Sequence, residues 1–205
     1  MKKIIFIILV FFAWKHFYYV GSAPDLGPGI MAAGMPFQTQ PTISSFRRDD
    51  YTFTPFSEYE VEARVISIKR YYFDEQARLS NSDFILGWGK MSDESVLNEI
   101  DISQKDRGYE WESDSMPISK EEITNSSVNM HLIPENGLIA NKIKEVRIGD
   151  IVHIKGYLVN VHSAAGWNWN SSRSGSSIYD MGGGDDKIYY VKSIRIVDPY
   201  ENSSY

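Results

Sequence analysis

Three histidines beyond the N-terminal segment are the side chains best suited to acid–base chemistry: His131, His153 and His162. They are separated by 22 and 9 residues, and the chain has no cysteine and no H-E-x-x-H motif. A local zinc-binding motif is therefore absent. We expect each imidazole to be a strand or loop residue with its own hydrogen-bond partner. The alternative is a hydrolase in which His131 or His162 acts with a distant serine or carboxylate.

Serines cluster in SSRSGSS, residues 171–177, together with Arg173. A serine hydrolase needs its nucleophile on a sharp turn near a histidine, and the G-x-S-x-G motif of one such class is absent. A polar loop is the simpler interpretation. Just downstream, DMGGGDD places three carboxylates around three glycines, but its spacing does not match an EF-hand. We favour a hairpin connection there, and we expect no metal site and no cofactor.

Tryptophans offer a second kind of site, a surface on which ligand rings stack. Trp88 lies between two glycines, and Trp167 and Trp169 are two residues apart, which places them on one face of a strand. Trp167 and Trp169 are therefore either both in the core or both on the surface. Packing in the core is the favoured interpretation of the tryptophans. If they face a ligand instead, the candidate binding residues are Trp88, Trp167, Trp169 and Arg173.

The N-terminus predicts export across a membrane. Lys2 and Lys3 precede an apolar run from Ile4 to Trp14, which suits a signal peptide, whereas extension to Val20 would give a short uncleaved anchor. The chain carries a formal charge of −6, and setting aside its three lysines before Asp25 leaves −9. Nucleic acid is therefore not an expected partner, because its binding depends on clustered basic residues.

Composition divides the chain into four parts: a signal peptide or membrane anchor over 1–20, a flexible linker rich in glycine and proline over 21–48, a β-rich globular domain over 49–199, and a frayed tail over 200–205. In the domain, alternating apolar residues from Tyr59 to Val65 shift phase to Ile66, which predicts a β-bulge in a long strand.

Further along the chain, Ser92–Ile100 has a helical pattern, with Ser92 or Asp93 as its first cap, and Ser119 begins a capping box. Pro134–Val146 is also helical in pattern, with core positions at Leu138, Ile139, Ile143 and Val146. Residues 151–161 read as a strand that bends at Gly156, followed by a turn and a returning strand with the two tryptophans. We expect a mainly β fold with minor helix, arranged as a small, partly open barrel of the OB type after an N-terminal membrane helix.

Several segments together resemble a family of small, uncharacterised bacterial proteins with an N-terminal membrane segment and one exported β-rich domain: FILGWGKMSDESV, DISQKDRGYEW, NMHLIP, and GDIVHIKGYLVNV followed by GWNWNSS. The resemblance covers most of residues 51–197 and implies topology and domain extent without an activity. In that family the W-x-W-x-S-S stretch leads to an Arg-x-Asp-x-Gly segment and a Cys-Glu pair. This chain keeps Trp167, Trp169, Ser171 and Ser172 but lacks the cysteine, which argues against a catalytic role for that pair.

These patterns favour a non-enzymatic protein tethered to the bacterial inner membrane by one segment, with a domain in the periplasm that binds an envelope protein. Cleavage would make it periplasmic or secreted. An envelope hydrolase and a sugar- or oligonucleotide-binding OB-like module are the alternatives, and the latter needs exposed tryptophans in one groove.

Overall fold

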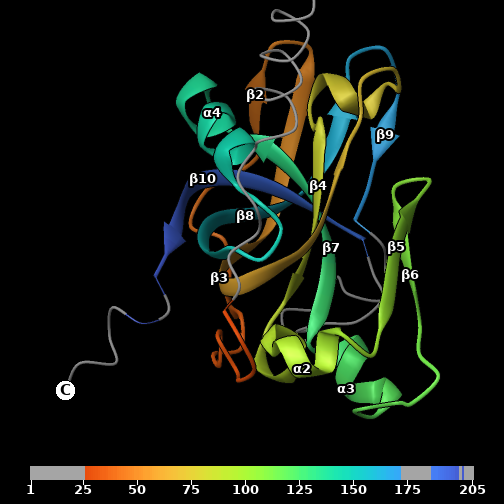
Figure 1. The fold of residues 1–205 in the computed structure, drawn as a ribbon. Helices are drawn as coiled ribbons and strands as arrows, with labels where there is room; N and C mark the ends of the chain where they lie inside the picture. Colours follow the sequence, from red (N-terminus) through yellow and green to blue (C-terminus); the bar gives the residue numbers. More distant parts are fainter. Residues whose placement is uncertain (1–25, 172–185, 199, 201–205) are drawn as a thin grey trace, which may run out of the picture.

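One twenty-residue strand, β3 (Tyr51–Arg70), organises the domain. The computed structural model describes residues 26–171, 186–198 and 200. The second half of β3 pairs with β4 (Ser82–Gly87), and the order continues through β7 (Ser127–Pro134), β10 (Asp186–Val197) and β8 (Ile151–Ser163), which pairs with β3 again (Figure 1). The sheet is thus partly closed on itself, and the expected mainly β fold with minor helix is confirmed. Neighbours in this order are antiparallel except β7 and β10, which are parallel.

The bend of β3 follows from its sequence. Tyr59, Val61, Ala63 and Val65 are buried, in alternation with more exposed residues. The pairing with β4 then shifts register between Val65 and Ser67, where the apolar pattern changes phase. The predicted bulge is therefore confirmed. It lets one strand contribute to two parts of a curved sheet.

Part of the segment that we expected to be a flexible linker, residues 21–48, packs on the sheet. Within it, β1 (Phe37–Thr39) pairs with residues 58–60 of β3, and β2 (Phe46–Arg48) pairs with residues 51–53. Ala32 is fully buried. The physical reason is that β4 covers only the second half of one edge of β3. The two short strands bond to the edge that remains.

Helix α4 (Gly137–Glu145) packs against β7 and β10. The helix was expected from Pro134, but Pro134 ends β7, and the helix begins after Asn136, whose side chain accepts the backbone N–H groups of the next turn. Ile139 and Ile143 are buried. Leu138, which we expected in the core, is 75% exposed because it lies on the outer face of the first turn.

The other helices of the described residues are short: η1 (Gln76–Arg78), η2 (Gly89–Ser92), α2 (Glu94–Leu97) and α3 (Lys120–Asn125). Two expected caps are present. Asp93 accepts a hydrogen bond from the backbone of Ser95 at 2.9 Å, and Ser119 accepts one from the backbone of Glu122 at 3.1 Å.

Gly156 allows β8 and β10 to approach each other closely. A Cβ atom at Gly156 would lie 2.0 Å from the carbonyl oxygen of Tyr190, so no other residue fits this position without a shift of backbone. Beyond Ser163, β8 turns through Gly166 and returns as β9 (Asn168–Trp169), as the sequence indicated.

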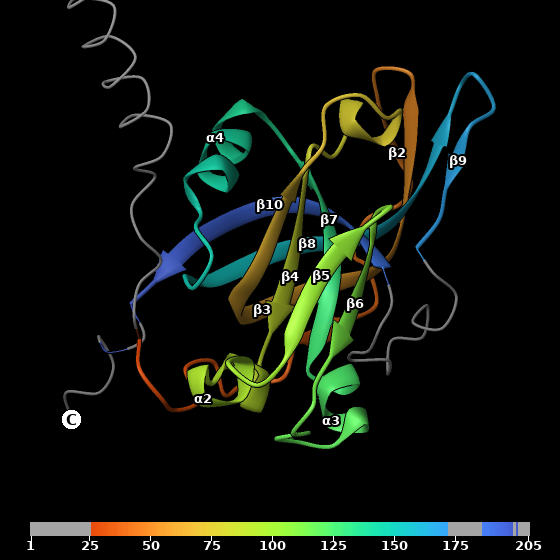
Figure 2. The same cartoon turned by 45° about the vertical axis from the view of Figure 1, so that its right-hand side comes forward.

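A separate hairpin, β5 (Asp101–Lys105) and β6 (Gly108–Glu112), lies over β4 and β7 (Figure 2). Because strand residues alternate between faces, Phe84 and Leu86 of β4 and Val128 and Met130 of β7 belong to the main core cluster. The alternate residues of β4 and β7 point to the opposite face of the sheet, toward the hairpin.

Among the described residues, no helix is long and apolar enough to cross a bilayer. The predicted signal peptide or anchor, residues 1–20, lies outside the described residues, as does most of the predicted tail. The hydroxyl of Tyr200 donates to the carbonyl of Leu26 at 2.5 Å, so the two ends of the described domain lie together.

Candidate functional site

Polar side chains are buried on the outer face of β4 and β7, beneath the β5–β6 hairpin. Asp83 alternates along β4 with core residues, and Asn129 and His131 do so along β7. Oδ2 of Asp83 lies 2.9 Å from Nδ1 of His131, and the two side chains are 0% and 2% exposed. A carboxylate sealed from water in this way needs charged or hydrogen-bonding partners.

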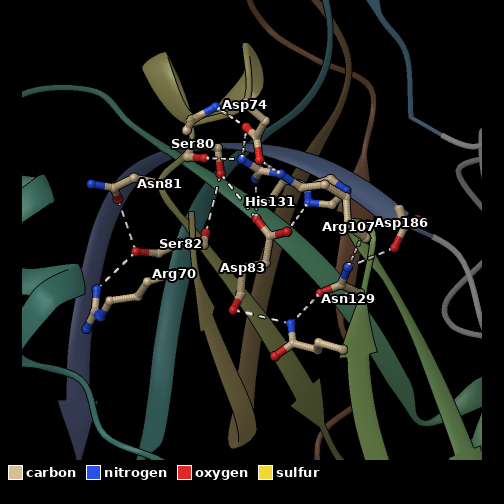
Figure 3. A network of polar contacts seen from close by, with 12 residues as sticks. Arg70, Asp74, Ser80, Asn81, Ser82, Asp83, Arg107, Asn129, His131 and Asp186 are labelled. Atoms are coloured by element: carbon tan, nitrogen blue, oxygen red, sulfur yellow. Dashed lines mark hydrogen bonds and ion pairs between the residues drawn. The ribbon is translucent and has the colours of Figure 1, made fainter. Parts of the chain in front are cut away.

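Arg107 supplies the positive charge from the turn of the β5–β6 hairpin (Figure 3). Asp106 and Arg107 have φ angles of 51° and 68°, the left-handed conformation that a two-residue hairpin turn of type I′ requires. Nη1 of Arg107 donates to Oδ1 of Asp83 at 2.9 Å, and Nη2 donates to Oδ1 of Asp74 at 2.6 Å and to the carbonyl of Ser80 at 3.0 Å.

The same guanidinium lies 3.8 Å from the centre of the Tyr71 ring. This distance is within the range of a cation–π interaction. Burial, with the negative charge of Asp83 as a smaller cause, raises the pKa of the Tyr71 hydroxyl above its ordinary value. Tyr71 is therefore neutral at physiological pH. Arg107 thus joins the hairpin to the loop after β3 and to β4.

Two amide side chains extend this network. Nε2 of Gln104 donates to Oδ1 of Asn129 at 3.1 Å, and Nδ2 of Asn129 donates to the carbonyl of Arg107 at 2.7 Å and to Oδ1 of Asp186 at 2.8 Å. The hairpin is therefore fixed on the sheet at the point where β10 begins.

The enclosure of His131 disfavours acid–base catalysis. The ring of Trp169 lies against the imidazole, with ring centres 4.9 Å apart and an angle of 40° between the planes. In the described part of the chain, no serine hydroxyl forms a hydrogen bond with His131. A general base must reach the proton that it removes, and this histidine has almost no exposed surface.

The other two histidines have the ordinary hydrogen-bond partners that we expected. Nε2 of His153 lies 2.7 Å from a carboxylate oxygen of Glu60, and His162 contacts the side chain of Asn168. Glu60 also pairs with Lys155 at 2.9 Å, and the hydrogen bond from Lys155 is the main cause that lowers the pKa of Glu60. Among the described residues, neither histidine side chain forms a hydrogen bond with a serine hydroxyl.

An open groove of about 700 Å³ lies beside the buried network. We call it the hairpin groove, and its lining residues are 69–74, Gln76 and 104–107. Tyr72 and Phe73 are 70% and 100% exposed, with ring centres 6.3 Å apart and ring planes inclined by 60°. Tyr71, Asp74 and Arg107 belong to both the groove and the network.

Three cations also line the hairpin groove: Lys69, Arg70 and Lys105. Over residues 26–171 and 186–198, no carboxylate forms an ion pair with any of them. Arg70 bonds instead to uncharged oxygens, the hydroxyl of Ser82 at 3.0 Å and the carbonyl of Lys144 at 3.3 Å. The groove therefore offers exposed aromatic rings and unpaired positive charge, which suit binding rather than bond cleavage.

The structure separates the binding residues chosen from the sequence. Trp88 is 2% exposed and belongs to the main core cluster. Trp167 and Trp169 are both half-buried, with ring centres 5.9 Å apart, and pack against a second apolar cluster on the other face of the sheet. They share a face, as expected, and that face is neither wholly core nor wholly surface. Arg173 lies outside the described residues.

Sequence reasoning missed both the buried ion network and the hairpin groove. The signal for Asp83 is present, because a single charged residue begins the apolar strand segment DFILGW. The signal for the groove is the pair Tyr72-Phe73 directly after a strand that ends in Lys69-Arg70. Arg107 has no such signal, since its partners are 24 and 33 residues away.

No group of three or more potential ligand side chains that could hold a metal ion is found in the part of the chain that the structure describes. Comparison of the chain with protein-family models, with curated proteins and with solved structures finds no match.

Proposed function

We propose that this protein is a non-enzymatic binding protein of the bacterial envelope, tethered to the inner membrane by its N-terminal segment, and that the hairpin groove is its binding surface. The observation that carries the proposal is the exposure of Tyr72 and Phe73 beside unpaired cations in one groove. The predicted export signal and the resemblance to membrane-anchored exported proteins support the location.

The proposed fold type is an OB-like barrel. Numbered one to five along the chain, the main strands are β3, β4, β7, β8 and β10. Their order in the sheet is one-two-three-five-four, and strand four pairs again with strand one. In the sequence, α4 lies between strands three and four. OB folds bind their ligands on the face of strands two and three and in the adjoining loops. β4 and β7 occupy those places here, and the groove is formed by the first adjoining loop and by the hairpin that covers this face.

The hydrolase alternative has less support. Of its two candidate histidines, His131 is enclosed by Trp169 and held by Asp83, and His162 contacts the side chain of Asn168. The pair of His131 and Asp83 serves the attachment of the hairpin. The tryptophan-groove alternative for sugars or oligonucleotides also has less support, because Trp88 is buried and only Trp167 and Trp169 are partly accessible.

Site-specific photocrosslinking in intact cells tests the proposed surface. A photoreactive amino acid replaces Phe73 in one full-length chain and Leu138 in the control, since both side chains are largely exposed and lie on different elements. We expect a discrete adduct from position 73 that weakens when Lys69 and Lys105 are changed to glutamate, and none from position 138. Equal adducts at both positions, or none at 73, would exclude the groove as the binding surface.

Cell fractionation tests the proposed location. An uncleaved anchor keeps the full-length chain in the membrane pellet after an alkaline carbonate wash, and the domain becomes sensitive to protease once the outer membrane is opened. A shorter chain in the periplasmic extract would show that the N-terminal segment is removed. Retention of the domain in the cytoplasm would refute the proposed location.

A further inference from the structure

We infer that the hairpin groove binds an acidic segment of a partner protein, one that also carries an apolar side chain which packs against Tyr72 and Phe73. This inference rests on the proposed function and names the class of its ligand. It follows from the charge, the ring geometry and the rigidity of the groove.

The charge of the groove predicts the charge of its partner. The groove carries the positive charges of Lys69 and Lys105, and the charge of Arg107 is balanced by Asp74 and Asp83. Arg70 also lines the groove, but its guanidinium bonds to Ser82 and to the carbonyl of Lys144 on α4. Asp106 is the remaining carboxylate of the lining, so two cations without an ion pair among the described residues face one anion. The whole chain has a net charge of −6, and the groove is thus locally opposite to the molecule around it. Complementary charge of this kind selects an anionic partner and speeds its encounter.

The geometry of the two exposed rings favours a protein as the ligand over a nucleic acid or a polysaccharide. Successive bases stack on flat aromatic platforms, but Tyr72 and Phe73 are adjacent in sequence and inclined to each other by 60°. Their rings project as an apolar knob instead. Exposed aromatic residues beside basic ones are the composition of protein–protein hot spots, where aromatic and arginine side chains dominate the binding energy.

The groove is also held in shape before a partner binds. Its floor contains Arg107 and Tyr71, and the Arg107 guanidinium is fixed by Asp74, Asp83 and the carbonyl of Ser80. Gln104 fixes the hairpin side, because its Nε2 donates to Asn129 and its Oε1 accepts from the hydroxyl of Ser67. Little ordering entropy is then lost when a partner binds, apart from that of the lysines and the two exposed rings.

The test measures fluorescence anisotropy of labelled probes with the full-length chain in detergent micelles. The probes are a short peptide of glutamates around leucines, the same peptide with lysine for each glutamate, an oligogalacturonate, and an oligothymidylate. We expect the acidic peptide to bind at least ten-fold more tightly than the basic one, with an affinity that falls as salt is added.

Matched variants show whether the acidic peptide binds in the hairpin groove. Phe73→Ala, and separately Lys69→Glu with Lys105→Glu, are each expected to weaken the acidic peptide about ten-fold, the effect of losing one anchor side chain. On α4, Leu138→Ala truncates another exposed apolar residue, and Lys142→Glu with Lys144→Glu reverses two exposed lysines. Both controls should alter binding less than two-fold.

The outcomes separate this inference from the proposed function. Equal affinity for acidic and basic peptides, or tighter binding of oligogalacturonate or oligothymidylate through Phe73, overturns the ligand class while the groove remains the binding surface. Binding of the acidic peptide that is unaffected by the groove variants also overturns the inference. If no probe binds and position 73 gives no crosslink in cells, both proposals fail.

Discussion

Replacing Arg107 with alanine tests the role assigned to the buried ion network. The change removes four hydrogen bonds: two to Asp74, at 2.6 and 3.3 Å, one to Asp83 at 2.9 Å and one to the carbonyl of Ser80 at 3.0 Å. It also removes the contact with the Tyr71 ring. Asp83 has no exposed surface, so its carboxylate would keep only the imidazole of His131 at 2.9 Å and a long hydrogen bond from the Ser80 hydroxyl at 3.4 Å.

The expected cost follows from that geometry. Breaking a buried ion pair by removing one partner costs about 3–5 kcal/mol, and the neighbouring His131 places this case at the lower end, about 3 kcal/mol. Chemical denaturation followed by circular dichroism measures the free energy of unfolding. Lys90→Ala is the control, because its pair with Glu122 is 51% and 34% exposed and should be worth less than about 1 kcal/mol. A loss of under 1 kcal/mol for Arg107→Ala would refute the reasoning.

Three further changes test the core. Gly156→Ala should prevent correct assembly of β8 with β10, seen as loss of folded protein, whereas Gly34→Ala, with nothing within 4 Å of the new Cβ, should not. Trp88→Ala should cost about 3–5 kcal/mol in denaturation experiments, as for a buried aromatic residue; a change below 1 kcal/mol would contradict its place in the core. Tyr189→Phe loses the hydrogen bond to the carbonyl of Tyr59, worth about 1 kcal/mol at pH 7. Burial raises the pKa of both tyrosines far above their unfolded value near 10, so stability is lost as pH rises beyond 10, by about 1.4 kcal/mol per pH unit for each group. Tyr189→Phe should therefore flatten the alkaline fall in stability, and an unchanged slope would show that Tyr189 ionises in the folded state.

The fold was predictable where one residue or one local pattern determines the geometry. The phase change after Val65 indicated the bulge, and Gly156, where we expected the strand to bend, is a point of close approach between β8 and β10. Asp93 and Ser119 began their helices as capping residues should. Each of these features depends on neighbours in sequence or on the size of a single side chain.

The candidate site was not predictable, because it depends on partners that are distant in sequence. Nothing near Arg107 indicates that it will enter a pocket formed by Asp74 and Asp83. The short strand at Phe37–Thr39 was missed for the same reason, since it pairs with the uncovered edge of β3 about 20 residues later in the sequence. Trp88 shows a different difficulty, because an aromatic residue between glycines fits both a binding face and the core, and the structure places it in the core.

The position of β10 has a consequence for how the chain folds. This strand is among the last parts of the sequence, yet it lies between β7 and β8 and bonds to both. Until it is in place, two strands have open edges, which are hazards for pairing with other chains. Closure also joins β3 to β8, about 100 residues later in the chain, and such distant contacts make folding slow. The domain should therefore acquire its core late and in one step, and removal of the final strand should leave an aggregating chain rather than a smaller domain.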